Sequence, residues 1–142
     1  MRKLLIAAFS FLALPAHASD MGAFSKWNAV KDARGPVNTW AQIAALPYRS
    51  DKGDTWKTPA QFYREGGDCE DYAIAYRAAL LASGTNEADI KLLTVQSPSG
   101  IHSVLVHDGM VYDILKPKPY ALRSMEYTPV FWLKRDVWGR DI

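Results

Sequence analysis

The spacing of apolar positions along this chain changes near residue 90. Before that point, apolar residues recur every three or four positions, which is typical of amphipathic helices. After it, short runs rich in β-branched and aromatic residues alternate with turn residues, which is typical of strands. The pattern therefore predicts an α+β fold in which the helices come first and an antiparallel sheet follows.

Two helices are expected between residues 19 and 45. The first carries Phe24, Trp27 and Val30 at helical spacing and is broken by the Arg34-Gly35-Pro36 segment. The second covers residues 37–45 and stops before a proline.

Two further helices are expected from their capping residues. Thr58 and Pro59 have the character of an N-cap and a first helical residue, and they predict a short helix that ends before a glycine pair. Asp68 is a good N-cap with Asp71 three residues later, close to a capping box, and Gly84 is a natural stop. The second of these helices begins with Cys69, the only cysteine of the chain.

The second half of the chain predicts an antiparallel sheet. Asp108-Gly109 is a strong signal for a type I′ hairpin turn because both central positions of that turn need a positive φ angle. It separates two apolar, β-branched runs. The strands are expected at residues 90–96, 101–107, 110–115 and 130–133.

The hairpin turn also fixes which side chains share a face of the sheet. With His107 opposite Met110, the alternation of side chains places His102, Val104 and Asp113 on one face. Asp113 is then the diagonal neighbour of His102, within reach of its side chain. We expect this face to lie against the start of the Cys69 helix.

The N-terminus has the features of an export signal. Arg2 and Lys3 precede an apolar run of residues 4–14, and Ala16-His17-Ala18 fits a cleavage site. The run is too short to span a bilayer, which takes about 20 residues. We therefore expect a signal peptide at residues 1–18, one domain at residues 19–142 and a periplasmic or secreted product with no membrane span after cleavage.

The charge balance gives no indication of a nucleic-acid partner. The formal net charge of +2 comes from 17 basic and 15 acidic residues. Removal of Arg2 and Lys3 leaves 15 of each, so the predicted mature chain is neutral. A protein that tracks phosphates would instead carry a basic patch.

A solitary cysteine in an exported protein is either a small buried apolar residue or a reactive thiol. Cys69, His102 and Asp113 have the chemical types of a catalytic triad, with nucleophile, proton carrier and orienting carboxylate in turn. A helix N-terminus also favours a thiolate. The same three residues separately fit structural roles in a core, but together they favour nucleophilic catalysis.

The acidic neighbours of the thiol oppose its ionisation. Asp68, Glu70 and Asp71 surround Cys69, and a helix terminus contributes only about 0.3–1 kcal/mol in the opposite direction. We hypothesise that these carboxylates hold calcium, together with Asp51 or Asp54 of the preceding loop. The alternative is that they only cap the helix, and the chemistry itself requires no cofactor.

Two segments resemble the bacterial transglutaminase-like cysteine proteinases. They are DTWKTP at residues 54–59 and GDCEDYAIA at residues 67–75, followed by a histidine and an aspartate on successive strands. The resemblance implies a papain-like fold, a triad of Cys69, His102 and Asp113, and a periplasmic peptidase of surface proteins that is calcium-dependent in some members. Trp56 and Gln61 are candidates to assist the backbone N–H of Cys69 in an oxyanion site.

The sequence thus predicts an exported cysteine peptidase that hydrolyses peptide or isopeptide bonds of envelope or surface proteins through an acyl-thioester. A transglutaminase-type acyl transferase would use the same triad. A catalytically silent binding module of the envelope is the alternative outside enzymes.

Overall fold

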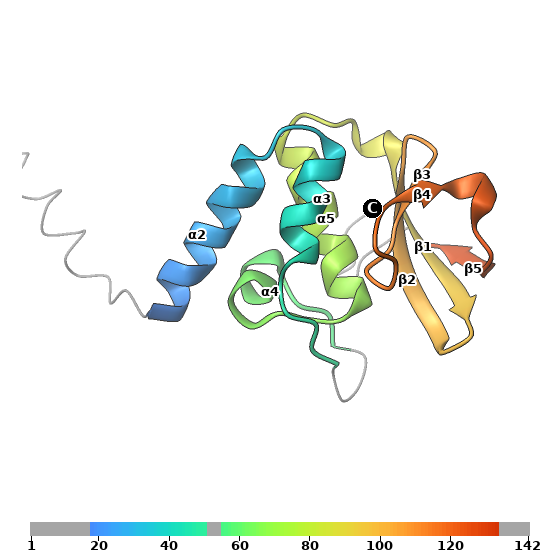
Figure 1. Cartoon of the computed structure of the whole chain (residues 1–142), viewed down its shortest axis with the longest axis horizontal. Helices are drawn as coiled ribbons and strands as arrows, with labels where there is room; N and C mark the ends of the chain where they lie inside the picture. Colours follow the sequence, from blue (N-terminus) through green and yellow to red (C-terminus); the bar gives the residue numbers. More distant parts are fainter. Residues whose placement is uncertain (1–17, 51–54, 134–142) are drawn as a thin grey trace, which may run out of the picture.

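The computed structural model describes residues 18–50 and 55–133 (Figure 1). The predicted signal peptide, apart from Ala18, lies outside these residues, as do Asp51, Asp54 and residues 134–142. Across the described segments, no helix combines the length and apolar character that crossing a bilayer requires.

Four helices come first and lie on one side of a sheet, as Figure 1 shows. Two of them begin at the residues that their capping residues predict, Pro59 and Cys69. The helices are α2 (Ala18–Asp32), α3 (Pro36–Ala44), α4 (Pro59–Glu65) and α5 (Cys69–Ala82).

Two capping interactions fix where α4 and α5 begin. The Thr58 hydroxyl accepts the backbone N–H of Gln61, while the Gln61 side-chain oxygen accepts the backbone N–H of Thr58. At the start of α5, the Asp71 carboxylate accepts the backbone N–H of Asp68 at 3.1 Å. The predicted helix start at Cys69 is therefore confirmed.

The sheet has five antiparallel strands in the order β4-β3-β2-β1-β5. A single-turn 3₁₀ helix, Glu87–Asp89, precedes β1, and a second, Leu122–Ser124, follows β4. The strands are β1 (Ile90–Ser97), β2 (Gly100–His107), β3 (Met110–Tyr112), β4 (Tyr120–Ala121) and β5 (Thr128–Trp132).

The β2–β3 hairpin has the predicted turn and register. Asp108 and Gly109 have φ angles of 50° and 70°, as a type I′ turn requires, and His107 pairs with Met110. The strand predicted at residues 110–115 is shorter than expected and ends at Tyr112. Asp113 ends it because its carboxylate accepts the backbone N–H of Leu115 at 2.8 Å and turns the chain away.

Both faces of the sheet are buried. The face toward the helices joins Leu92, Leu105 and Tyr112 to the aromatic residues of the helices. The opposite face holds a second apolar cluster that segments around β4 and β5 cover with partly buried side chains. This cluster contains Leu93, Val95, Val104, Val106 and Val111, covered by Tyr120, Leu122, Met125 and Tyr127.

This arrangement corrects one expectation about the site. Val104, and with it His102 by alternation, lies on the face away from the helices, not on the face packed against α5. Leu105 occupies the face toward α5 instead. The start of α5 therefore approaches His102 from the edge of β2, as the site geometry shows.

Candidate active site

His102 and Asp113 form a close, buried pair. His102 Nε2 lies 2.6 Å from Asp113 Oδ1, and the two residues are 4% and 1% exposed. The predicted strand register brings them together, because Asp113 directly follows the residue paired with Leu105. With Nε2 donating to the carboxylate, Nδ1 is left as the acceptor of the imidazole ring.

Cys69 is the first residue of α5 and is partly buried. Its Sγ donates to Glu70 Oε2 at 2.8 Å and lies within hydrogen-bonding reach of the Ser103 backbone N–H. Among the described residues no hydrogen bond joins the thiol to His102. The Ser103 contact nevertheless places the sulfur one peptide unit from His102.

The early end of β3 makes this contact possible. In the β2–β3 ladder the N–H groups of every second residue of β2 point toward β3, beginning with His107 at the hairpin. Ser103 has the same orientation but lies beyond the last pair, Leu105 with Tyr112. Its N–H is thus left for the start of α5, and the thiol takes the place that a longer strand would occupy.

The environment of the thiol favours its protonated form. Burial raises the pKa of Cys69 to about 12, helped by its hydrogen bond to Glu70 and by the charges of Glu70 and Asp68. The Ser103 N–H lowers that pKa but does not offset the rest. The neutral thiol therefore predominates at physiological pH in this arrangement.

Of the three acidic residues around the thiol, Asp68 has a buried oxygen, Oδ1, without a hydrogen-bond partner among the described residues. Burial, and then the charge of Glu70 and the hydrogen bond and charge of Asp71, raise the pKa of Asp68 to about 8. A carboxylate with a buried, unpartnered oxygen favours its protonated form unless a positive charge is supplied.

Asp71 has a structural position at the start of α5. It is 1% exposed, and its two oxygens accept the backbone N–H groups of Lys57 at 2.7 Å and Asp68 at 3.1 Å. Gly67 packs so closely on it that an added Cβ would lie 2.4 Å from Asp71 Oδ2. Asp71 thereby joins the segment before α4 to the start of α5.

Gln61 and Trp56, the predicted oxyanion residues, have other contacts in the structure. Gln61 is engaged in the cap of α4, and Trp56 is half-buried against the helix-side core. Asp68, Glu70 and Asp71 adjoin the thiol, but no three His, Cys, Asp or Glu side chains within residues 18–50 and 55–133 are gathered as metal ligands.

Three contacts of the site have no sequence signal. Glu70 binds the thiol, Ser103 approaches it through the backbone, and the Tyr127 ring lies edge-on to His102 with centroids 5.9 Å apart. Tyr48 also stacks on Tyr72, with ring centroids 6.1 Å apart. Burial, and then the charge of Cys69, raise the pKa of the Tyr48 hydroxyl. Glu70 is a neighbour of the thiol already in the sequence, but its hydrogen bond and the approach of the other residues are revealed only by the spatial arrangement.

A helix that begins with a thiol and packs on an antiparallel sheet carrying a His–Asp pair is the arrangement expected of a transglutaminase-like cysteine peptidase. The family model of the bacterial transglutaminase-like cysteine proteinases (BTLCP) matches residues 19–138. The chain belongs to this family and is a cysteine peptidase of the transglutaminase-like type. Comparison with curated protein sequences gave no match.

Solved structures of LapG from Legionella pneumophila share the fold. The calcium-bound form has a TM-score of 0.72 and 23% sequence identity, covering 90% of this chain and 83% of that chain. The EGTA-treated form has a TM-score of 0.74 and 21% identity, covering 89% of this chain and 80% of that chain. The fold is therefore the papain-like, transglutaminase-like one that the sequence predicts.

Proposed function

We propose that this protein is an exported, periplasmic cysteine peptidase that hydrolyses peptide or isopeptide bonds of envelope or surface proteins. Cys69 is the nucleophile, His102 the proton carrier and Asp113 the group that orients the imidazole. The observation that supports this most strongly is the buried His102–Asp113 pair beside the backbone that the thiol contacts. An isolated buried carboxylate would be costly, so Asp113 needs such a partner.

In the acylation step, Nδ1 of His102 accepts the proton of the thiol. The thiol turns from Glu70 to this nitrogen and gives up its proton, and the sulfur attacks the substrate carbonyl carbon. The backbone N–H of Cys69, with Trp56 or Gln61, stabilises the oxyanion. The intermediate collapses as the carbon–nitrogen bond breaks, and the leaving amine takes the proton from Nδ1.

Deacylation uses the same groups in reverse roles. Water gives a proton to Nδ1 as its oxygen attacks the thioester carbonyl. The carbon–sulfur bond then breaks, the carboxylic product leaves, and the sulfur regains the proton from the imidazolium. Throughout, Asp113 holds the Nε2–H and stabilises the positive ring.

A bound calcium ion would offset the negative charge of the carboxylates beside the thiol. Asp68 and Glu70 offer hard oxygen ligands, and the unpartnered Oδ1 of Asp68 fits such a role. Asp71 already accepts two backbone N–H groups, so the remaining ligands must come from elsewhere. The LapG structures include calcium-bound and EGTA-treated forms. When bound here, calcium would supply positive charge that weakens the hold of Glu70 on the thiol.

One observation favours a silent binding module instead. The thiol is protonated and bound to Glu70, so it is not activated in this arrangement. A melting curve measured with calcium and with EGTA tests whether the acidic residues beside the thiol bind calcium or only cap α5. If EGTA leaves both the melting temperature and the thiol reactivity unchanged, the calcium proposal fails.

The direct test is incubation with envelope extracts. Wild-type protein and Cys69→Ala are compared, and the cleaved proteins and their new termini are identified by mass spectrometry. The proposal expects fragments that appear with the wild type alone. Products in which an amine has replaced water would indicate the acyl transferase, and extracts unchanged by the wild type in the presence of calcium would contradict the peptidase.

A further inference from the structure

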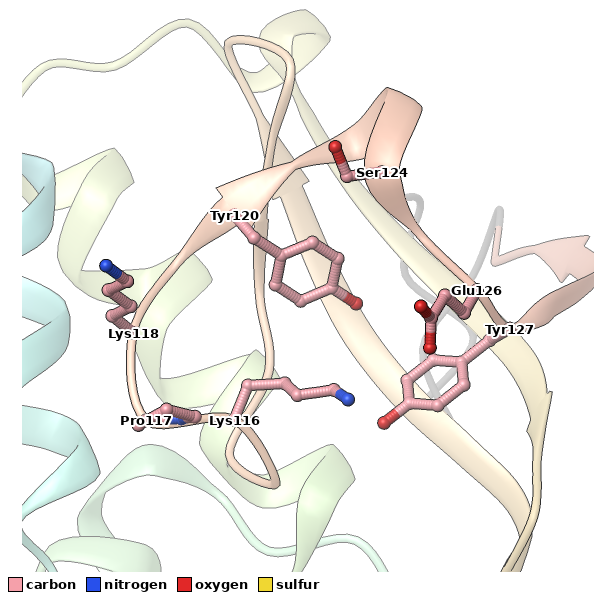
Figure 2. Close-up of a pocket in the computed structure, with 7 residues that line it drawn as sticks. All are labelled: Lys116, Pro117, Lys118, Tyr120, Ser124, Glu126 and Tyr127. Atoms are coloured by element: carbon pink, nitrogen blue, oxygen red, sulfur yellow. The ribbon is translucent and has the colours of Figure 1, made fainter.

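The face of the sheet away from the helices carries a pocket beside the His102–Asp113 pair. Its volume is about 280 Å³, and Figure 2 shows the side chains that line it. Lys116, Tyr120 and Tyr127 extend into the same space, with Glu126 beside the Tyr127 ring. The pocket therefore lies on the side of the His102–Asp113 pair opposite to α5. None of the residues that line it has a role in the proposed reaction.

Tyr127 separates this pocket from the imidazole. It lines the pocket and also packs its ring at 83° to the ring of His102, with centroids 5.9 Å apart. This edge-to-face arrangement is a favourable one for aromatic rings. The same side chain thus forms a wall of the pocket and a contact surface for the histidine.

Two neighbours hold the Tyr127 ring in place. Lys116 Nζ lies over its face, 5.3 Å from the centroid, and the second apolar cluster packs against it. Burial, and then the charge of Asp113 and a hydrogen bond to its carboxylate, raise the pKa of the Tyr127 hydroxyl. The neutral phenol therefore stays beside the carboxylate, and Tyr120 is in the same position, with its pKa raised to about 12 by burial and then by Asp113.

The His102–Asp113 pair depends on being kept from water. Asp113 is 1% exposed and its Oδ2 is buried, so this carboxylate is poorly solvated. A hydrogen bond in such surroundings is stronger than one in water. Water entering from the pocket would compete for both partners and let the imidazole rotate.

We infer that Tyr127 is a positioning residue that holds His102 in the plane of its bond to Asp113 and excludes water from that bond. It acts through the histidine and does not contact the reacting atoms. The inference rests on the proposed triad for its catalytic meaning, but the effect on the pair itself does not depend on activity.

The test uses the Nε2–H proton of His102, observed by NMR in the Cys69→Ala protein so that no turnover is needed. A hydrogen-bonded, shielded imidazole proton gives a downfield signal that is lost when it exchanges with water. We expect the signal to persist in Tyr127→Phe, which keeps the ring, and to disappear in Tyr127→Leu, which keeps an apolar side chain but removes the ring. Tyr120→Phe is the matched control and keeps the signal.

Activity provides the second readout. With Cys69 restored, we expect Tyr127→Leu to lower kcat on a cleaved envelope protein about tenfold or more with KM little changed, while Tyr127→Phe stays within about threefold. A signal that persists in Tyr127→Leu, or is lost equally in Tyr127→Phe, overturns the inference. If the wild type cleaves nothing but the NMR result holds, the proposed function fails and the positioning role stands.

Discussion

The Nε2 atom of His102 donates to Oδ1 of Asp113 across 2.6 Å, between side chains that are both almost fully buried. Asp113 also accepts the backbone N–H of Leu115 with the same oxygen. The residue that ends β3 is thus the residue that orients the histidine. This coupling of a strand end to a side-chain pair explains why the strand stops short of its predicted length.

Replacement of Asp113 tests the orienting role. We expect Asp113→Ala to lower kcat/KM by about 10²–10⁴, the usual contribution of a positioned acid–base group. Asp113→Asn should lose less, because its side-chain oxygen still accepts the Nε2–H and the Leu115 N–H. Both are measured on a protein cleaved in envelope extracts, with melting temperatures as the control for folding. A folded Asp113→Ala protein that cleaves at the wild-type rate would contradict the assignment.

Glu70 restrains the thiol, so its removal should increase thiol reactivity. Glu70→Gln removes a carboxylate that both accepts the S–H and repels a thiolate. We expect the alkylation rate of Cys69 by iodoacetamide in EGTA at pH 8.5 to rise about tenfold, which corresponds to about one pKa unit. Glu87→Gln, at an exposed carboxylate that pairs with Arg77, is the control and should change nothing. An unchanged rate in Glu70→Gln would show that burial alone sets the pKa.

Asp71 is expected to contribute to the stability of the fold through its two backbone hydrogen bonds. Asp71→Ala leaves the N–H groups of Lys57 and Asp68 without their acceptor, and we expect it to cost about 2–4 kcal/mol of unfolding free energy. Asp89→Ala, at an exposed carboxylate, is the control. Urea denaturation should show a lower midpoint with an unchanged slope. A loss below about 1 kcal/mol would mean that water replaces Asp71 at both N–H groups.

Asp68 predicts a dependence of stability on pH. Its folded-state pKa of about 8 lies above the ordinary value of 3.8, so the folded protein binds the proton more tightly than the unfolded chain. Stability in EGTA should therefore fall as pH rises from about 4 to 8. Asp68→Asn keeps an N-cap residue and removes the titrating carboxyl, and with it this dependence on pH. We expect it to be more stable than the wild type by about 1 kcal/mol at pH 8, a modest value because Asp68 is only partly buried, and equal to it near pH 4. An equal difference at both pH values would assign the effect to packing.

Local patterns predict much of this fold because its signals are short-range. Thr58, Asp68 and Gly109 each satisfy a backbone requirement within a few residues of themselves, and the structure has the corresponding caps and turn. The hairpin register then follows, and with it the pairing of His102 and Asp113. The site residues that lie on this hairpin were thus predictable as neighbours.

Long-range packing is not predictable in the same way. Val104 and Leu105 are equally apolar, so alternation alone cannot say which face the helices cover, and the expectation placed His102 on the wrong one. The bond from Cys69 to Glu70 depends on side-chain rotamers at a helix start. Tyr127 comes from a segment with no periodic pattern, just before β5, so nothing in the sequence indicates its contact with His102.

In the proposed mechanism His102 and Cys69 act as one unit, and the rate of alkylation of Cys69 tests this most directly. Iodoacetamide is applied in the presence of calcium from pH 5 to 9 to the wild type and to His102→Ala, with His107→Ala as the control for the other histidine of the hairpin. We predict that the wild type and His107→Ala react faster than a free model thiol below pH 7, and that His102→Ala loses this reaction. A wild-type rate no higher than that of the model thiol, and unchanged by His102→Ala, would contradict the account.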